Sequence, residues 1–290
     1  MEYTLLKVGS DAEFFVQQNA VPIPICGRLG GTKADPKPVL SGNGYAVQED
    51  NVAVEFNIPP ASTASEFAHS IATMLAYLKA ELAKQDLTVA YRSEENFTQE
   101  ILHQFPDAYR FGCEPDFCVW TRTVNPSPEA EPYFVVNPLT KAKEAVEQRC
   151  AGFHIHVSYL VDGRQSTLEE KEIFVKAQDI FLGVPLTLMD INAHRQHVAR
   201  RRRWYGSAGA FRPKEYGHEY RVLGSSVLTA DYGLNEWIFE ANQRAIRWLN
   251  QVRDPEPVFH DNRGHIMAAI NQYSTDHCRH LMQHFGLSLP

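Results

Sequence analysis

Acidic or imidazole side chains stand two residues apart in several short segments of this chain. Asp11 and Glu13 lie in GSDAEFFV, and His154 and His156 lie in GFHIHVSY. Both segments have the composition of β-strands, and residues i and i+2 of a strand point to the same face. Each pair is therefore predicted to project from one side of a sheet. Oxygen ligands combined with one or two imidazoles suit Mg²⁺ or Mn²⁺, so these side chains are candidate metal ligands.

Two more acidic segments follow a similar spacing. Glu114 and Asp116 lie in GCEPDFCVW, and Glu55 shares the strand-like VAVEFN with Asn57. Each carboxylate could instead be a solvent-exposed group on a half-buried strand, and the histidines could belong to a polar network. The repetition over several strands favours one metal-binding face, because buried carboxylates are costly without partners.

A basic run stands out in a chain whose formal net charge is −7. Residues 200–203 are all arginine, and Arg212 and Lys214 follow after several glycines and aromatic residues. Guanidinium groups suit phosphoryl transfer, because they bind phosphate oxygens in pairs and neutralise developing charge. Glu219 and Arg221 in HEYRVLGSS then place a metal-type carboxylate beside a phosphate-type guanidinium. A solvated surface run or an RNA-binding patch is the alternative for the arginines.

The segment GRLGGTKADPKPV combines glycines with two lysines but does not match the spacing of a P-loop. We expect a loop that folds over a substrate or nucleotide, with Lys33 and Lys37 as candidate contacts. A tolerated surface loop is the plain alternative.

The elements that must position these residues alternate irregularly between strands and helices. Strands are expected at residues 5–8, 12–17, 45–48, 51–58, 87–91, 112–120, 152–159 and 217–224, with a turn at Glu49 and Asp50. Helices are expected at 62–85 with Ser62 or Thr63 as N-cap, at 93–105, at 167–191 with a bend at Pro185, and at 231–251. Residues 201–217 read as a loop, and residues 260–287 contain two short helical patterns. This order predicts an α+β fold with a largely antiparallel sheet.

Composition limits the possible classes of protein. The chain has 290 residues, of which 44% are hydrophobic and 22% charged, so a core of ordinary size and one domain over residues 1–290 are expected. Its apolar stretches are too short to cross a membrane, and its N-terminus lacks the pattern of a signal peptide. Five cysteines without a CxxC pair predict reduced thiols in a cytoplasmic protein. The acidic balance makes a nucleic-acid partner unlikely by default.

Several of these motifs, in their order along the chain, resemble a known superfamily. GSDAEFF, VAVEFNIPPA, GFHIHVSY and HEYRVLGSS resemble the glutamine synthetase and glutamate–cysteine ligase superfamily. GTKADPKP, GCEPDF and RRRWYGSAGAFRPKEYGHEYR resemble its phage-type carboxylate–amine ligases, the COOH.NH2 ligase-type 2 group. The resemblance covers about residues 9–226. It implies a curved, mostly antiparallel sheet around ATP and Mg²⁺ or Mn²⁺, with helices on the convex face, as in the catalytic domain of glutamine synthetase.

The resemblance also implies the reaction and the roles of the residues. ATP would phosphorylate a small-molecule or peptide carboxylate, and an amine would displace the phosphate to give an amide. The expected metal ligands are Asp11, Glu13, Glu55, Glu114, Asp116, His154 and Glu219. The expected catalytic groups are Arg203, Arg212 and Arg221, and the expected nucleotide contacts are Lys33, Lys37, His156, Arg201 and Lys214. An oligomer is compatible with these motifs, and a phage-encoded enzyme would work in the host cytoplasm.

Two other functions fit parts of the same pattern. A metal-dependent amidase or hydrolase could use the carboxylate and histidine face without ATP, although it has less need of several phosphate-facing arginines. A nucleic-acid-binding protein could use residues 200–203, although the acidic balance of the chain opposes this.

Overall fold

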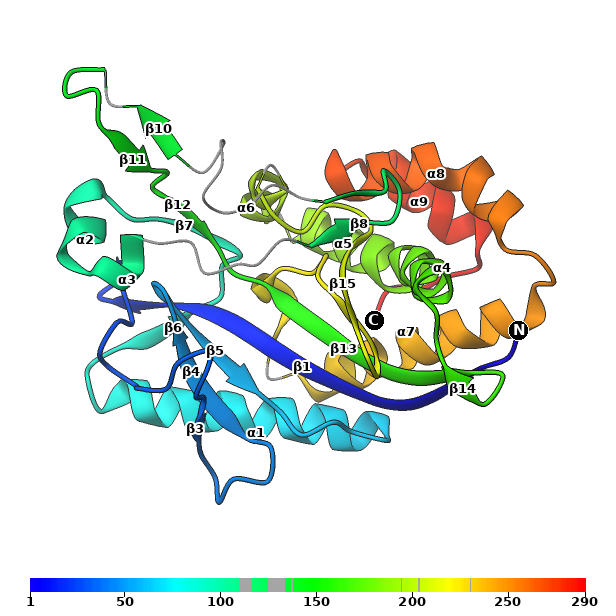
Figure 1. Cartoon of the computed structure of the whole chain (residues 1–290), viewed down its shortest axis with the longest axis horizontal. Helices are drawn as coiled ribbons and strands as arrows, with labels where there is room; N and C mark the ends of the chain where they lie inside the picture. The colour runs from blue at the N-terminus through cyan, green and yellow to red at the C-terminus, as the bar shows by residue number, and fades with distance from the viewer. Residues whose placement is uncertain (110–115, 125–133, 137, 194, 203, 230) are drawn as a thin grey trace.

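A computed structural model describes residues 1–109, 116–124, 134–136, 138–193, 195–202, 204–229 and 231–290. Its centre is a 12-stranded sheet, and every pairing between named strands in these ranges is antiparallel. The main path of the sheet runs in the order β3-β4-β5-β1-β13-β16-β15-β8-β9, and β2, β6 and β14 pair beside it (Figure 1). The predicted α+β class with a mostly antiparallel sheet is confirmed.

The strands of the main path are β3 (Lys37–Pro38), β4 (Ala46–Asp50), β5 (Ala53–Asn57), β1 (Tyr3–Gln18), β13 (Phe153–Val161), β16 (Gly217–Tyr220), β15 (Ala210–Lys214), β8 (Phe117–Cys118) and β9 (Thr123–Val124). The strands beside it are β2 (Val21–Ile23), β6 (Thr88–Ala90) and β14 (Arg164–Gln165). Two small sheets pair β7 (Glu94–Asn96) with β12 (Gln148–Cys150), and β10 (Phe134–Val136) with β11 (Lys143–Ala145). The β10–β11 ribbon projects from the molecule at the upper left of Figure 1.

The longer helices are α1 (Ala64–Ala83), α4 (Leu168–Gln178), α5 (Val184–Asn192), α7 (Tyr232–Gln251), α8 (Glu256–Asn271) and α9 (Thr275–His284). The shorter ones are α2 (Gln99–Gln104), α3 (Pro106–Tyr109), α6 (Gln196–Arg201), a π-helical turn η1 (Asp179–Gly183) and a 3₁₀ turn η2 (Ser225–Val227). Thr63 caps α1, since its side chain accepts the Glu66 N–H at 3.2 Å and Glu66 reaches back to the Thr63 backbone.

The sheet separates an apolar core from a polar face. Along β1, Ala12 and Phe14 are fully buried among apolar side chains, while Asp11 and Glu13 project to the other side. Phe14 stacks on Phe56 of β5 at a centroid distance of 5.7 Å. Helix α7 contacts both α1 and α4, and all three contact strands of the sheet on this apolar side (Figure 1). The opposite face is thereby left for the carboxylates.

The segment at residues 167–191 is helical as predicted, but its irregularity lies at η1 and not at a bend on Pro185. Pro185 stands in the first turn of α5, where a proline costs the helix little because the N–H it lacks would have no helical partner. The fully buried Asp179 of η1 accepts hydrogen bonds from Trp120 Nε1 at 2.6 Å and from the Tyr220 hydroxyl at 2.7 Å. The helix is therefore joined through this carboxylate to the back of β16.

The residues expected in strands at 5–8 and 12–17 are strand residues, and they belong to the single strand β1. Three local predictions are wrong. The turn expected at Glu49 and Asp50 lies one step later, because Asn51 takes the left-handed conformation with φ of 55° and Asp50 pairs with Ala53. Residues 93–105 contain β7 before the short helix α2. The loop expected at residues 201–217 begins at the last residue of α6 and contains β15, so Arg212 and Lys214 stand on a strand.

The structure bears on the expectations about the cysteines and about membrane-spanning helices. Cys26, Cys118, Cys150 and Cys278 are free thiols, whereas Cys113 lies outside the described residues. None of the described helices has both the length and the apolar content needed to cross a membrane.

Candidate active site

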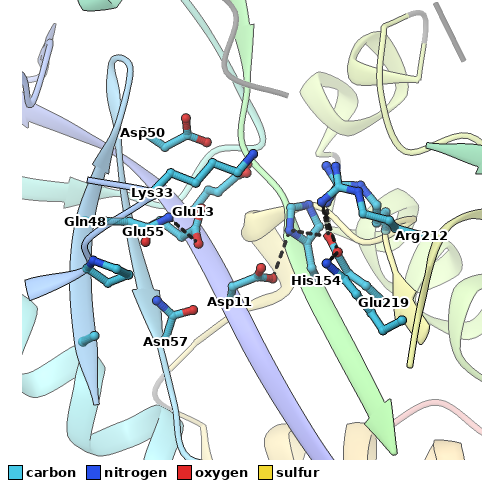
Figure 2. A pocket seen from close by; sticks show the side chains of 14 residues that line it. Asp11, Glu13, Lys33, Gln48, Asp50, Glu55, Asn57, His154, Arg212 and Glu219 are labelled. Atoms are coloured by element: carbon cyan, nitrogen blue, oxygen red, sulfur yellow. Dashed lines mark hydrogen bonds and ion pairs between the residues drawn. The ribbon is translucent and has the colours of Figure 1, made fainter. Parts of the chain in front are cut away.

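Three carboxylates from adjacent strands form the first acidic group of the polar face. Glu13 of β1 lies opposite Glu55 of β5, and Asp50 of β4 completes the group. One carboxylate oxygen from each residue lies within 4.8 Å of the other two (Figure 2). The Gly152 N–H donates to Glu13 Oε2 at 2.6 Å, and Gln48 Nε2 donates to Glu55 Oε1 at 2.9 Å. Three oxygens at this spacing can surround one hard divalent cation.

A second group of ligands comes from β1 and from the strands β13 and β16, which follow β1 on the side away from β5. Asp11, His156 and Glu219 each offer one ligand atom, and these atoms also lie within 4.8 Å of one another. His156 Nε2 is 3.1 Å from Asp11 Oδ2, and its Nδ1 is 2.6 Å from the Tyr216 hydroxyl. His154 bridges the same carboxylates, with its Nδ1 at 3.0 Å from Asp11 Oδ1 and 3.6 Å from Glu219 Oε1. Both histidines therefore face this group, although only His154 was expected to bind metal.

Except for His156, the members of both groups line one pocket of about 390 Å³, and cations line it as well. Arg212 Nη1 lies 3.1 Å and Lys214 Nζ 3.3 Å from Glu219 Oε2, and the Arg221 guanidinium contacts the other oxygen of the same carboxylate. Lys33 enters from the glycine-rich loop, and Figure 2 shows its side chain extended into the pocket between Asp50 and Glu13. The pocket thus combines metal-type carboxylates with the cations that bind phosphate.

Arg201 lies away from the pocket lining. Its side chain is fully buried, its Nη1 donates to the Val222 carbonyl at 3.1 Å, and its guanidinium stands 4.8 Å from the centre of the Tyr205 ring. The Arg221 guanidinium stands 4.9 Å from the centre of the same ring. Arg201 therefore supports the aromatic residue that Arg221 also contacts. Arg203 lies outside the described residues.

Lys37 and Asp116 also lie outside the pocket lining. The Lys37 ammonium donates to the Leu29 carbonyl at 2.9 Å, which holds the glycine-rich loop closed on itself. Asp116 Oδ2 accepts a hydrogen bond from Arg221 Nε at 3.2 Å, so this carboxylate orients a pocket residue. Glu114, the other member of the expected pair, lies outside the described residues.

Three polar residues of the pocket lining were not among the predicted site residues. Gln48 and Asp50 follow Ala46 along β4 at strand spacing, and Asn57 lies opposite Asp11 across β1 and β5. Asp50 was missed because it was predicted to lie in the turn, and a residue in a turn cannot be assigned to one face of a sheet. Asn51 was the available signal, since asparagine is enriched in the left-handed conformation that a tight hairpin turn requires.

Comparison with known proteins bears on the half of the site that follows β12. A family model described as Phage phiEco32-like COOH.NH2 ligase-type 2 matches residues 131–238. The predicted family resemblance is confirmed. The matched segment contains His154, His156, Arg212, Glu219 and Arg221, and it begins after the strands that carry the first acidic group. The family name denotes ligases that join a carboxyl group to an amine. No curated protein matches the chain.

Burial and mutual repulsion govern the pKa values of the first acidic group. Burial, followed by the charge of Asp50, raises the pKa of Glu13 to about 8. Burial and the charges of Asp11 and Glu13 raise the pKa of Glu55 well above its usual value. Without a cation, Glu13 therefore holds a proton near neutral pH, and burial disfavours the charged form of Glu55 as well. A bound divalent ion would remove that preference, because it offsets the charge they would otherwise carry unpaired.

The histidines have the opposite effect on Asp11. Burial would raise the pKa of Asp11, but the charges of His156 and His154 and their hydrogen bonds lower it well below its usual value. Burial, followed by the charge of Arg221, lowers the pKa of His154 to about 3, so this imidazole is neutral at physiological pH. A neutral imidazole beside an ionised carboxylate is the form in which both can bind a metal.

We predict that the metal-free protein loses stability between pH 7 and pH 9. A carboxyl whose pKa is higher in the folded than in the unfolded state stabilises the fold at low pH, and this contribution disappears as the pH rises through the folded value. Glu13 rises from 4.5 to about 8, so its share in this window is on the order of 1 kcal/mol. His154, lowered to about 3, acts in the opposite direction but only below about pH 6.5.

The measurement is urea unfolding in EDTA at pH 7, 8 and 9 for the parental protein and Glu13→Gln. The parental free energy of unfolding should fall more steeply with pH than that of the variant. Equal slopes would show that Glu13 titrates normally in the folded protein.

Proposed function

We propose that this chain is an ATP- and Mg²⁺-dependent carboxylate–amine ligase, with Mn²⁺ as an alternative ion, that forms an amide bond through an acyl phosphate. One observation carries the proposal: the five carboxylates of the two metal-type groups and the cations Lys33, Arg212, Lys214 and Arg221 line a single pocket. A sheet face holding ATP in this way would correspond to the catalytic sheet of glutamine synthetase. Such an enzyme would work where ATP is supplied, which is the cytoplasm.

The donor set fits hard divalent cations. Oxygen atoms dominate both groups, and His156 adds a single imidazole, which suits Mg²⁺ or Mn²⁺ better than softer metals. Glu13, Asp50 and Glu55 would hold one ion, and Asp11, His156 and Glu219 would hold another. Bound there, the ions would supply the positive charge that draws ATP oxygens together and offsets charge during phosphoryl transfer.

The proposed reaction has two steps. An oxygen of the substrate carboxylate attacks the γ-phosphorus of ATP, the bond from that phosphorus to the β,γ-bridging oxygen breaks, and ADP leaves. The amine nitrogen then attacks the acyl carbon, the bond from that carbon to the phosphate oxygen breaks, and the nitrogen loses a proton. Arg212, Lys214 and Arg221 now contact Glu219, and they lie within the same pocket to receive the transferred phosphoryl group.

The two alternatives receive less support from this geometry. A metal-dependent amidase would not need four cations beside its metal ligands. A nucleic-acid surface would need several exposed arginines, but Arg201 is fully buried and Arg202 is half-buried against the Val222 carbonyl, while the exposed Arg200 pairs with Glu94 at 2.7 Å.

The test uses hydroxylamine as a general amine, because it converts an acyl phosphate to a coloured hydroxamate whatever the natural amine is. Purified protein with Mg²⁺ and ATP is screened against a panel of carboxylic acids for ADP and hydroxamate. Equal amounts of both, requiring the acid, support the ligase. Hydrolysis of amides without nucleotide, together with no acid-dependent ADP, would refute it. Carboxylate labelled with ¹⁸O should pass one labelled oxygen to the released phosphate.

One carboxylate accepts four backbone N–H groups from the loop that carries Lys33. Glu49 of β4 accepts the backbone N–H groups of residues 27–30 at 2.6, 2.9, 2.7 and 2.7 Å. Charge-assisted hydrogen bonds of this kind are stronger than neutral ones. Glu49 therefore fixes the start of the loop whose later residues bring Lys33 over the first acidic group.

We expect Glu49→Ala to raise the KM for ATP on the order of tenfold, equivalent to about 1.4 kcal/mol, with a smaller effect on kcat. The physical reason is that Lys33 loses its fixed position while the metal ligands stay in place. Steady-state kinetics with varied ATP measures the effect. Glu49→Gln should recover part of it, since an amide oxygen still accepts hydrogen bonds. An unchanged KM in Glu49→Ala would mean that the loop does not position Lys33 on the nucleotide.

A further inference from the structure

A second pocket of about 380 Å³ adjoins the first on the same face of the sheet. Asn57 lines both pockets, and His156 lines the second while its Nε2 contacts Asp11 of the first at 3.1 Å. The boundary between the pockets is therefore made by Asn57 and by His156, which belongs to the second set of metal-type ligands. A molecule in the second pocket would reach the place where phosphoryl transfer is proposed.

The strand register explains why this space exists. In the pairing of β1 with β13, Lys7 lies opposite Ser158 and Gly9 lies opposite His156. The next pair on the same face is Asp11 and His154. Gly9 has no side chain to fill the floor between Lys7 and Asp11. A Cβ on Gly9 would already stand 3.7 Å from His156 Cβ and 3.8 Å from Pro60 Cα, so a larger side chain would occupy the pocket.

The chemistry of the second pocket differs from that of the first. Five described carboxylates line the first pocket, whereas no carboxylate lines the second among the residues that the structure describes. Its polar side chains include Lys7, Asn57, Ser158 and Tyr216, and each of them can donate a hydrogen bond. Ile58 and Pro60 add an apolar wall. A lining of donors with a cation and no anion suits a negatively charged ligand.

We propose that this second pocket binds the carboxylate substrate, and that this substrate carries another anionic group, a carboxylate or a phosphate, which Lys7 recognises. The reacting carboxylate lies at Asn57 and His156, beside the metal-type ligands. The Lys7–Ser158 pair and the Gly9–His156 pair are two residues apart along β1, and the usual strand rise makes this a distance of about 6.6 Å. An acid whose two anionic groups are separated by a short chain spans that distance, with its chain against Ile58 and Pro60.

The amine substrate and the adenine ring fit this lining less well. An amine approaches as an ammonium ion, and the pocket offers it Lys7 and no described carboxylate. Adenine is neutral and gives Lys7 no charge to bind. The assignment rests on the ligase function proposed above, but equilibrium binding tests it without turnover.

The experiment is isothermal titration of the full chain with Mg²⁺ and a non-hydrolysable ATP analogue present. The probes are butyrate, glutarate, adipate and 3-phosphonopropionate. At least one probe with two anionic groups should bind on the order of tenfold more tightly than butyrate. Lys7→Ala should remove that advantage, and Lys7→Glu should weaken binding further. Preference for the phosphonate over the dicarboxylates identifies the second group as phosphate-like, and the reverse preference identifies a carboxylate.

Lys84→Ala is the matched control, because Lys84 is an exposed lysine on the opposite side of the sheet, paired with Glu81 just after α1. It should keep the parental affinities. The proposal is overturned if no probe with two anionic groups binds better than butyrate, if Lys7→Ala binds them equally, if 1,5-diaminopentane binds in their place, or if Lys7→Ala weakens only the ATP analogue. Acid-dependent ADP and hydroxamate, measured separately, decide the ligase function, so failure of one proposal is distinguishable from failure of the other.

Discussion

Replacing Glu13 by Gln should lower turnover at least about a thousandfold, equivalent to about 4 kcal/mol in the transition state, without weakening the metal-free fold. Glu13 is 5% exposed and its pKa is raised to about 8, so near pH 7 the metal-free protein already holds it mainly in the neutral form that glutamine imitates. Glutamine can still accept the Gly152 N–H that now binds Glu13 at 2.6 Å. The substitution removes only the negative charge that a divalent ion requires.

Three measurements on Glu13→Gln separate these effects. Acid-dependent ADP formation should nearly vanish, Mn²⁺ affinity should fall, and the melting temperature in EDTA at pH 9 should equal or exceed that of the parental protein. Glu169→Gln, at an exposed carboxylate in the first turn of α4, should leave all three unchanged. Turnover within a few-fold of the parental rate would exclude Glu13 from metal binding.

The spacing of the acidic pairs predicted the polar face because a strand has a period of two. Asp11, Glu13, Glu55, His154 and Glu219 converge in the structure, and antiparallel pairing brings their rows side by side. Spacing could not supply the register between strands that are far apart in the sequence. Register decides that Glu13 faces Glu55 and that His156 faces Glu219, and it depends on long-range packing of the core face.

The basic run shows where sequence alone was insufficient. Consecutive arginines on a helix such as α6 point in different directions, so a run of four arginines in the sequence does not by itself predict a positively charged surface. Arg201 turns into the core onto Tyr205, and Arg200 turns outward to Glu94. Of the pocket cations, Arg212 and Lys214 come from β15, a strand hidden by the glycines and aromatic residues around it. Arg221 directly follows β16, a strand that was predicted, and Lys33 comes from the glycine-rich loop. The mechanistic roles of these cations remain predictions.

The strand that carries Glu219 is also held from behind, which a motif cannot reveal. His218 and Tyr220 flank Glu219 and point into the core, where the Tyr220 hydroxyl donates to Asp179 at 2.7 Å. His218 Nε2 lies 2.5 Å from Gln178 Oε1, and its Nδ1 lies 3.0 Å from the Tyr159 hydroxyl. These buried polar contacts fix the height of β16 above the helices, and so fix Glu219 relative to Asp11 across the sheet.

The second large effect is expected at Arg221, which links the two halves of the site. It is 3% exposed, its Nε donates to Asp116 Oδ2 at 3.2 Å, another of its nitrogens contacts Glu219, and its guanidinium faces the Tyr205 ring. A lysine at this position keeps the charge but has one ammonium group in place of a planar fork. It can keep the contact with one carboxylate and loses the other contact and the ring stacking.

We therefore expect Arg221→Lys to lower kcat on the order of tenfold or more, a loss above about 1.4 kcal/mol, with a smaller change in the KM for ATP. Stability should fall by about 1.5–3 kcal/mol, the usual contribution of one hydrogen bond to a charged group. Steady-state kinetics and urea unfolding measure the two losses separately. Arg212→Lys is the matched comparison, since Arg212 contacts the same Glu219 carboxylate but its side chain is more exposed (14% against 3%), and it should lose rate with less loss of stability. If Arg221→Lys keeps the parental kcat and only unfolds more easily, Arg221 serves the fold, and stabilisation of the transferred phosphoryl group falls to Arg212 and Lys214.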